Sequence, residues 1–346
     1  MPAEDRPAIA NHRAMRRLAF MLLWLIVLDP FIPSIVRKLE KSHYEGRSAF
    51  RFENSDLFGL GPLVSYLREH PRGDRRRAVF LGNSMMFGYL LDTSNALPAE
   101  FEKQNPGTRV FNMAVNGQET GSSYLISKAV IDSVDVIFVQ VIGESVNPML
   151  ASLIPVDRAD ARRFQLQPPD PLEQRLKEHA GRLWRLYRFN QRIQAALFGT
   201  STRQYLYMHK RVVARALLRL GRKPVKAVDA TPAPSVRPSI IAPRAPVRSE
   251  PRKDLSRGDA ILRDLAELAR SHRKRVVLLT FEYGHQPPGP EIAELNATYA
   301  PFAERVVVMV PPTLTYDGQH LTEHGCRLVA DALARHEREA GQESRR

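Results

Sequence analysis

Residues 78–87 read AVFLGNSMMF, and this stretch decides the fold. The apolar run AVFL is typical of a buried strand, Gly82 ends it, and a helical pattern begins after Ser84. The same alternation of strand and helix continues along the chain. Further strands are predicted at 109–113, 134–142, 275–281 and 305–310, and helices at 98–104, 122–132, 259–272, 291–299 and 323–339. Alternating helices and Val- and Ile-rich strands predict a three-layer α/β/α domain with a mostly parallel sheet.

The composition is that of a globular protein. The 346 residues are 43% hydrophobic and 25% charged, which excludes a disordered chain, a collagen-like repeat and a coiled coil. The single cysteine, Cys326, excludes an intramolecular disulfide framework and a cysteine-built zinc cluster. The scattered histidines do not form metal-ligand spacing with carboxylates, so we expect no metal and no cofactor.

The basic charge is confined to one part of the chain. The net charge is +14, and residues 158–257 alone carry an excess of +16, so the remainder is close to neutral. Such a segment could attract nucleic acid, anionic lipid or acidic polysaccharide, or could simply be a solvated insertion. No zinc-finger spacing or aromatic RNA-binding motif accompanies the charge, so we expect no nucleic-acid partner.

The basic segment interrupts the α/β pattern. We assign 77–150 and 258–340 to the two parts of one domain and 151–257 to an insertion between them. The insertion is helical in pattern over 171–222, whereas 223–253 contains seven prolines and few large apolar residues. The second part therefore reads as a flexible linker or loop.

The N-terminal region contains a candidate membrane segment. Residues 18–36 read LAFMLLWLIVLDPFIPSIV, which admits Asp29 and two prolines near its end. An uncleaved signal-anchor, a cleaved signal peptide and a buried helix all remain possible. The lack of a small-residue cleavage site favours the anchor. The basic residues before it favour a cytoplasmic 1–17, with 37–76 connecting the anchor to an extracytoplasmic, periplasmic domain.

Candidate catalytic residues follow the predicted strands, and the carboxyl ends of parallel strands are where sites collect. Ser84 lies at a strand-to-helix turn, where backbone N–H groups can stabilise an oxyanion. Gly117 follows the second strand and lets the backbone approach a ligand. Asp317 precedes His320 by three residues and can orient its imidazole, which leaves the other ring nitrogen to accept a proton from a serine.

Three of these stretches resemble blocks of a known family. FLGNSMMFGY, NMAVNGQET and YDGQHLTEHG are similar to the first, second and Asp-x-x-His blocks of the SGNH (GDSL-type) hydrolase superfamily. The resemblance covers about residues 78–147 and 258–336 and implies a flavodoxin-like fold. It also implies that Ser84 is the nucleophile, His320 the general base and Asp317 its orienting partner.

The resemblance further implies an oxyanion hole that includes the backbone N–H groups of Ser84 and Gly117. Its third block departs from the family pattern. The family places an Asn in a Gly-x-Asn-Asp context, whereas this chain reads GESVN over 143–147, so either Ser145 or Asn147 takes that role. The family's Asp before the nucleophile is also replaced, by Asn83.

These features predict a membrane-anchored serine esterase or O-acyltransferase. The expected substrate is an O-acyl group, acetyl above all, on carbohydrate or envelope polysaccharide. The expected partners are that acylated polymer, the membrane through 18–36, and a multi-spanning membrane acyltransferase. The alternative is a non-catalytic SGNH-like protein that binds an anionic polymer or such an acyltransferase and assembles with it.

Overall fold

The computed structural model describes residues 19–20, 23, 26–46, 50–51, 57–70, 73–167, 170–207, 209–210, 239–241, 257–283 and 304–343. Its centre is a seven-stranded sheet in the order β1-β3-β2-β4-β6-β7-β5. The strands are β1 Phe50–Arg51, β2 Arg76–Leu81, β3 Thr108–Asn112, β4 Val136–Gln140, β5 Ser239–Ile241, β6 Arg275–Tyr283 and β7 Glu304–Val310. All neighbours pair in parallel except β5, which runs antiparallel to β7.

The strand order confirms the predicted α/β class. The series β3-β2-β4-β6-β7 has the order 2-1-3-4-5 of a flavodoxin-like sheet, to which β1 and β5 add one strand at each edge. The chain leaves β2 toward β3 on one side and later returns to β4 on the other. The crevice between β2 and β4 is therefore the topological switch point, where such sheets bind ligands.

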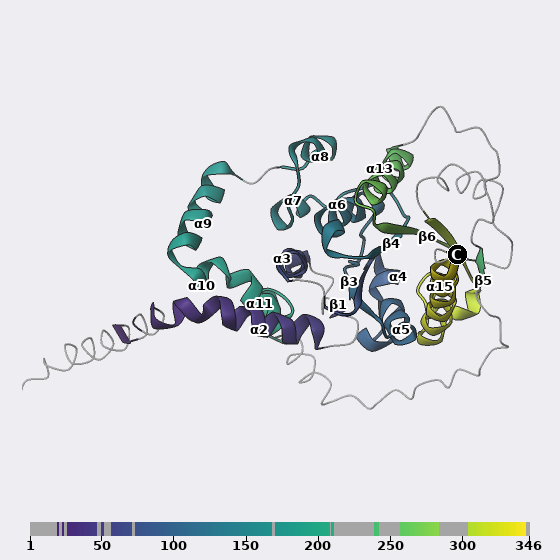
Figure 1. Ribbon diagram of the computed structural model, residues 1–346, viewed down its shortest axis with the longest axis horizontal. Coiled ribbons are helices and arrows are strands. Elements are labelled where there is room, and N and C mark those ends of the chain that lie inside the picture. Colours follow the sequence, from purple (N-terminus) through teal and green to yellow (C-terminus); the bar gives the residue numbers. More distant parts are fainter. Residues whose placement is uncertain are drawn as a thin grey trace, which may run out of the picture.

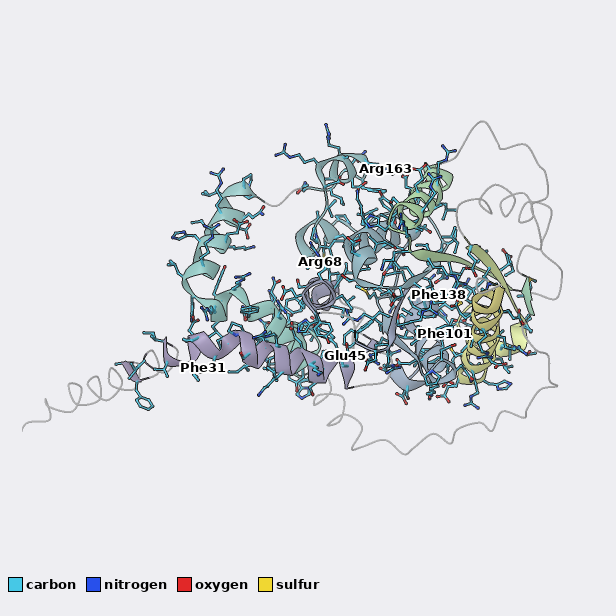
Figure 2. The ribbon with its side chains drawn as sticks, viewed as in Figure 1. Phe31, Glu45, Arg68, Phe101, Phe138 and Arg163 are labelled. Carbon is cyan, nitrogen blue, oxygen red and sulfur yellow. The ribbon has the colours of Figure 1, made fainter. Side chains whose placement is uncertain are left out.

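Helices cover both faces of the sheet (Figure 1). Helices α5 (Leu97–Gln104) and α15 (Glu323–Glu343) pack together on one face, and α6 (Thr120–Val130) packs with α13 (Arg257–Ser271) on the other. Phe80, Phe101 and Phe138 are buried and join the sheet to α5, with the Phe80 and Phe138 rings stacked at 4.4 Å. Figure 2 shows Phe101 and Phe138 inside the domain. The predicted helix at 291–299 lies outside the described residues.

The segment 37–76, expected to be a connection, contributes structure to the domain. It contains most of α2 (Ile32–Glu45), strand β1, the 3-10 turn η2 (Leu57–Gly59) and α3 (Leu60–Glu69). Leu60, Leu63 and Tyr66 of α3 are buried in the main core. Leu60, Leu63 and Tyr66 are three residues apart, and this spacing places them on one face of a helix.

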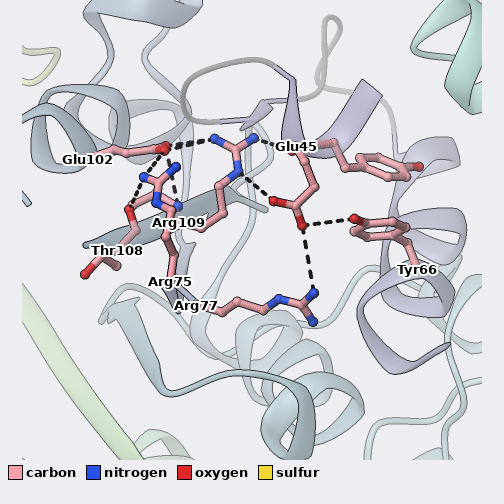
Figure 3. A network of polar contacts seen from close by, with 9 residues as sticks. Glu45, Tyr66, Arg75, Arg77, Glu102, Thr108 and Arg109 are labelled. Atoms are coloured by element: carbon pink, nitrogen blue, oxygen red, sulfur yellow. Dashed lines mark hydrogen bonds and ion pairs between the residues drawn. The ribbon is translucent and has the colours of Figure 1, made fainter. Parts of the chain in front are cut away.

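A network of charged side chains fastens α2 to the amino ends of the central strands (Figure 3). Arg109 of β3 pairs with Glu102 of α5 at 3.0 Å and approaches Glu45 at the end of α2. Arg77 of β2 also reaches Glu45, and the Tyr66 hydroxyl donates a 2.9 Å hydrogen bond to the same carboxylate. Paired in this way, the buried arginines avoid the cost of an isolated charge in the core.

The predicted membrane span is not recovered as one helix. A 3-10 turn, η1 (Asp29–Phe31), interrupts it, and α2 then starts at Ile32 with Pro33 in its first turn. Ile32 and Val36 are buried in this protein's own structure, where α2 packs against α11 (Asn190–Phe198). In the part of the chain that the structure describes, none of the helices combines the length and the apolar character that crossing a bilayer requires.

The insertion divides into a part that packs on the domain and a part that extends from it. Helices α7 (Leu150–Leu153) and α8 (Arg158–Arg163) lie against the domain, with Phe164 and Leu166 in its core. Helix α9 (Pro171–Leu183) projects away from it, and α10 (Arg185–Arg188) packs beside the start of α2 (Figure 1). Within 223–253, expected to be a linker, residues 239–241 form the edge strand β5.

A buried ion pair joins α11 to α2. Arg192 donates two hydrogen bonds to the Glu40 carboxylate, at 2.6 and 2.7 Å, and a third to Glu69 of α3. Glu40 is completely buried. Burial alone would lower the pKa of Arg192, but the hydrogen bonds that it donates to Glu40 and Glu69 raise the pKa above its usual value. The guanidinium therefore remains charged in the interface.

Glu40→Gln should destabilise the protein by about 3–5 kcal/mol, because it leaves the Arg192 charge buried with its main partner neutralised. The matched control is Glu173→Gln, which breaks the exposed Glu173–Lys177 pair on α9 and should cost less than about 1 kcal/mol. Guanidinium unfolding of both variants measures the difference. Equal losses would show that the buried pair does not hold α2 in place.

Candidate active site

The turn after β2 positions Ser84. The Asn83 side-chain oxygen accepts a 3.0 Å hydrogen bond from the Met85 N–H and so caps the short helix α4 (Ser84–Phe87). The Asn83 N–H in turn donates to the side-chain oxygen of Gln140, at the end of β4. A Cβ atom at Gly82 would lie 2.5 Å from that same oxygen, so only glycine fits there. The serine is thereby placed at the switch point between β2 and β4.

Two neighbouring strands hold the far end of α4. Arg51, the last residue of β1, donates to the carbonyl oxygens of Phe87 and Gly88 at 3.0 and 2.9 Å. Asn112, the last residue of β3, donates to the Met86 carbonyl at 2.9 Å. These bonds satisfy carbonyl groups that the end of a helix leaves without intrahelical partners. The helix that carries Ser84 is therefore fixed at both ends by side chains from the sheet.

A loop before α15 carries Asp317 and His320. The loop is closed by backbone hydrogen bonds from Tyr316 N–H to the His320 carbonyl and from Thr322 N–H to the Leu314 carbonyl. Gly318 has a φ of +86°, a conformation that strongly favours glycine. The turn folds the Asp317 carboxylate back onto the backbone and the ring of His320.

The structure brings the three predicted catalytic residues into hydrogen-bond contact. The Ser84 Oγ and His320 Nε2 atoms are 2.8 Å apart, although the residues are 236 positions apart in the chain. The His320 Nδ1 and Asp317 Oδ2 atoms are 2.7 Å apart. The His320 side chain is 19% exposed and that of Asp317 is 53% exposed, so the site opens to solvent on the aspartate side.

The Asp317 carboxylate determines which ring nitrogen carries the proton. Hydrogen bonds from the His320 backbone N–H, the His320 ring and the Gln319 N–H lower the pKa of Asp317 to about 2. An ionised carboxylate only accepts hydrogen bonds, so the proton of the neutral imidazole is on Nδ1. The Nε2 atom is then free to accept the hydrogen bond from the Ser84 hydroxyl. This is the arrangement that activates a serine.

The residues predicted for the oxyanion hole occupy three different settings. Gly117 has a φ of +74°, and nothing lies within 4 Å of the position of a Cβ atom there. Ser145 donates its backbone N–H to Glu119 at 2.6 Å, and Asn147 donates its own to the Ser122 hydroxyl at 2.9 Å. Neither Ser145 nor Asn147 forms a hydrogen bond with Ser84 or His320 among the described residues.

The sequence analysis missed Arg51, Gln140 and Tyr89 as neighbours of this site. Arg51 and Gln140 each end a strand, and this position is the signal that could have identified them. The Tyr89 ring lies 5.2 Å from the His320 ring and is 42% exposed. It follows α4 directly, but the sequence gives no sign that it faces a histidine more than 200 residues away.

Comparison with known proteins gives similarity at the level of structure alone. No protein-family model matches the sequence, and no curated protein sequence is similar to it. A putative lipolytic protein of the G-D-S-L family from Desulfitobacterium hafniense DCB-2 is 14% identical, with a TM-score of 0.32 over 75% of this chain and 99% of that one. TesA is 13% identical, with a TM-score of 0.31 over 75% and 96% of the two chains.

A two-domain esterase active on acetylated mannans is 9% identical, with a TM-score of 0.35 over 83% of this chain and 54% of that one. At these identities and TM-scores, the activities of these proteins do not transfer to this chain. The function proposed below rests on the geometry of Ser84, His320 and Asp317.

Asp317→Asn should slow the labelling of Ser84 by a fluorophosphonate probe roughly 10²- to 10⁴-fold, because an amide no longer fixes the Nδ1–H tautomer of His320. In the wild type, hydrogen bonds lower the pKa of Asp317 to about 2, so the carboxylate is ionised and accepts from Nδ1–H at the neutral pH of the assay. The control is Asp331→Asn, which removes an exposed acid paired with Arg335 and should leave labelling unchanged. Wild-type labelling of Asp317→Asn would contradict the role given to this aspartate.

Proposed function

We propose that this protein is a serine-dependent esterase or O-acyltransferase of the SGNH type, acting on O-acyl groups of carbohydrate. The observation that carries the proposal is the continuous hydrogen-bonded chain from Ser84 Oγ through His320 to Asp317. The chain lies at the carboxyl end of β2, where the strand order reverses. Three residues from two distant segments meet there in the geometry of acyl transfer.

The reaction proceeds in two halves. Ser84 Oγ attacks the ester carbonyl while His320 Nε2 takes the hydroxyl proton, and the resulting imidazolium is stabilised by the Asp317 carboxylate. His320 then protonates the departing alcohol, which leaves an acyl-serine. A water molecule or a second hydroxyl group attacks this ester, His320 again takes the proton, and Ser84 is regenerated. Water gives hydrolysis, and a sugar hydroxyl gives transfer.

The developing oxyanion needs hydrogen-bond donors near Ser84. In this proposal the backbone N–H groups of Ser84 and Gly117 supply two of them. Among the described residues, neither group donates a hydrogen bond to another part of the protein. A third donor would come from the 143–147 loop, through Asn147 or Ser145. That loop is fastened to the start of α6 by Glu119 and Ser122.

Exposed aromatic side chains beside His320 support a carbohydrate substrate. Tyr89 is in contact distance of the imidazole, and Tyr316, 53% exposed, donates its backbone N–H to the His320 carbonyl. Tyrosine offers an apolar ring face together with a polar hydroxyl, which suits the alternating apolar and hydroxyl-bearing faces of a sugar. The open aspartate side of the site gives a long polymer access. The sequence resemblance adds O-acetylated envelope polysaccharide as the proposed polymer.

The finer parts of the proposal concern location. We place the catalytic domain outside the cytoplasm, held at the membrane through residues 18–36, where it could work beside a multi-spanning acyltransferase. The apolar run and the basic residues that precede it support this location. The changed third block, 143–147, supports an alternative in which the protein binds a polymer or such an acyltransferase and assembles with it without catalysis.

Release of acetate from O-acetylated oligosaccharides, and its transfer to unacetylated ones, tests the function. Ser84→Ala and His320→Ala should each reduce either activity roughly 10⁴-fold or more, because both residues act in every chemical step. Ser94→Ala is the matched control, since Ser94 is an exposed serine on η3 (Thr93–Asn95) whose hydroxyl bonds only to Asn95 among the described residues. A folded wild type that shows neither activity nor fluorophosphonate labelling would exclude the enzyme and favour the binding protein.

A further inference from the structure

Helix α9 carries its apolar side chains on the outside. Leu172, Leu176 and Leu183 are separated by four and seven residues, so they align on one helical face. They are 65%, 62% and 74% exposed. Leucines repeated on one face are the pattern that normally buries a helix against its own protein. In the described part of the chain nothing covers this face.

The opposite face of α9 is polar and turns toward the protein. It borders an open hollow of about 620 Å³ between α9, α10 and α11. On α9 the hollow is lined by Gln174, Lys177, Glu178, Gly181 and Arg182. A surface helix ordinarily has its polar face in water and its apolar face inward, and α9 has the reverse arrangement. Its leucine face is therefore suited to an apolar surface outside the domain.

The charges around the leucine face indicate which surface. Arg175 and Arg182 lie one residue before Leu176 and Leu183, between the leucine face and the polar face, and Arg182 also borders the hollow. Among the described residues no ion pair of either arginine with an acidic side chain is found. Trp184 ends α9 and is 43% exposed, and Tyr187, 41% exposed, follows in α10 at the border of the hollow. An apolar stripe edged by arginine on one side, with Trp184 at its end, is a pattern found in helices that lie at a lipid interface. The arginines select anionic headgroups.

The position of α9 places a second apolar surface beside it. The Asp29 carboxylate accepts hydrogen bonds from the backbone N–H groups of Arg185 and Leu186, at 2.8 and 3.2 Å, and so caps α10 from a distant part of the chain. Arg185 also donates to the Pro30 carbonyl. The residues next to Asp29 expose further large apolar side chains: Phe20, Leu23, Ile26, Val27, Leu28 and Phe31. Figure 2 shows Phe31 at the start of α2.

We propose that α9 is an interfacial helix that lies on an anionic lipid bilayer. Its leucine face enters the boundary between headgroups and acyl chains, and Arg175 and Arg182 contact the phosphates. Because Asp29 caps α10, which follows α9, the leucine face and the exposed apolar side chains of Ile26, Val27 and Leu28 would meet the same membrane. The proposal concerns α9 itself and holds whether residues 18–36 span the bilayer or lie on it.

Tryptophan fluorescence can observe α9 separately from the N-terminus. The chain contains two tryptophans, so Trp24→Phe leaves Trp184 as the reporter at the end of α9. The full-length variant is reconstituted into vesicles of brominated phosphatidylcholine with or without phosphatidylglycerol. We expect the bromine atoms to quench Trp184 emission, more strongly with phosphatidylglycerol, and the quenching to weaken at high salt. The companion variant Trp184→Phe leaves Trp24 as the reporter. Its quenching measures the membrane contact of the predicted anchor separately from that of α9.

A pair of leucine substitutions tests the face. Leu172→Ser with Leu176→Ser should abolish most of the Trp184 quenching, because each leucine kept out of lipid weakens the partition roughly tenfold. Leu197→Ser with Leu206→Ser is the matched control, since both leucines are 54% exposed but lie outside α9, and it should leave quenching unchanged. Circular dichroism checks that both variants keep their helices.

Two results would overturn the proposal. The first is Trp184 emission that brominated lipid does not quench while Trp24 emission is quenched, which would leave the anchor and remove α9 from the membrane. The second is Trp184 emission that responds to the protein-to-lipid ratio but not to bromine, which would show that another copy of the chain covers the leucine face.

Discussion

The reversal of strand order between β2 and β4 is the constraint on which the site depends. At that point the chain leaves the sheet in opposite directions, so the carboxyl ends of the two strands face a crevice that no crossover helix fills. Ser84 leaves β2 there, and Gln140 at the end of β4 holds the backbone of Asn83. His320 reaches the same point from the loop before α15. It is 236 positions from Ser84 in the chain, so only the folding of the whole domain brings the two residues together.

Charged side chains at the ends of the strands serve two separate purposes. At the amino ends, Arg77 and Arg109 meet Glu45, which fastens α2 to the sheet. At the carboxyl ends, Arg51 donates to carbonyl groups at the end of α4, the helix that begins with Ser84. Arg77 and Arg109 hold α2 against the domain, whereas Arg51 holds the helix that carries Ser84. Because β1 and β2 run in parallel, an arginine at the end of the edge strand lies at the same end of the sheet as Ser84.

The sequence predicted the parts of the molecule in which local pattern and final structure agree. The run at 78–81, the β-branched run near 136 and the Asp-x-x-His spacing each identify their element because the necessary residues lie within a few positions of one another. The contacts of Arg51 and Tyr89 could not be predicted, since each depends on packing between segments far apart in the chain. Asp29 shows the same limit most clearly: the sequence analysis admitted it as a charge near the end of an apolar run, and its contact with the backbone of α10 depends on packing between distant segments.

The contact of Asp29 with α10 links the N-terminal residues to the inserted helices. A carboxylate within an apolar run is costly to place in lipid, and here two backbone N–H groups of α10 pair with it. The pairing stabilises the start of α10 and holds the basic helices next to the apolar N-terminal residues. From there α2 leads to the amino end of β2, while Ser84 follows the carboxyl end of the same strand, about 20 Å away for a six-residue strand. A bilayer that contacted α9 and the N-terminal residues would therefore lie nearer to the amino end of β2, to which α2 leads. Ser84, at the carboxyl end of β2, would remain accessible to a polymer in solution.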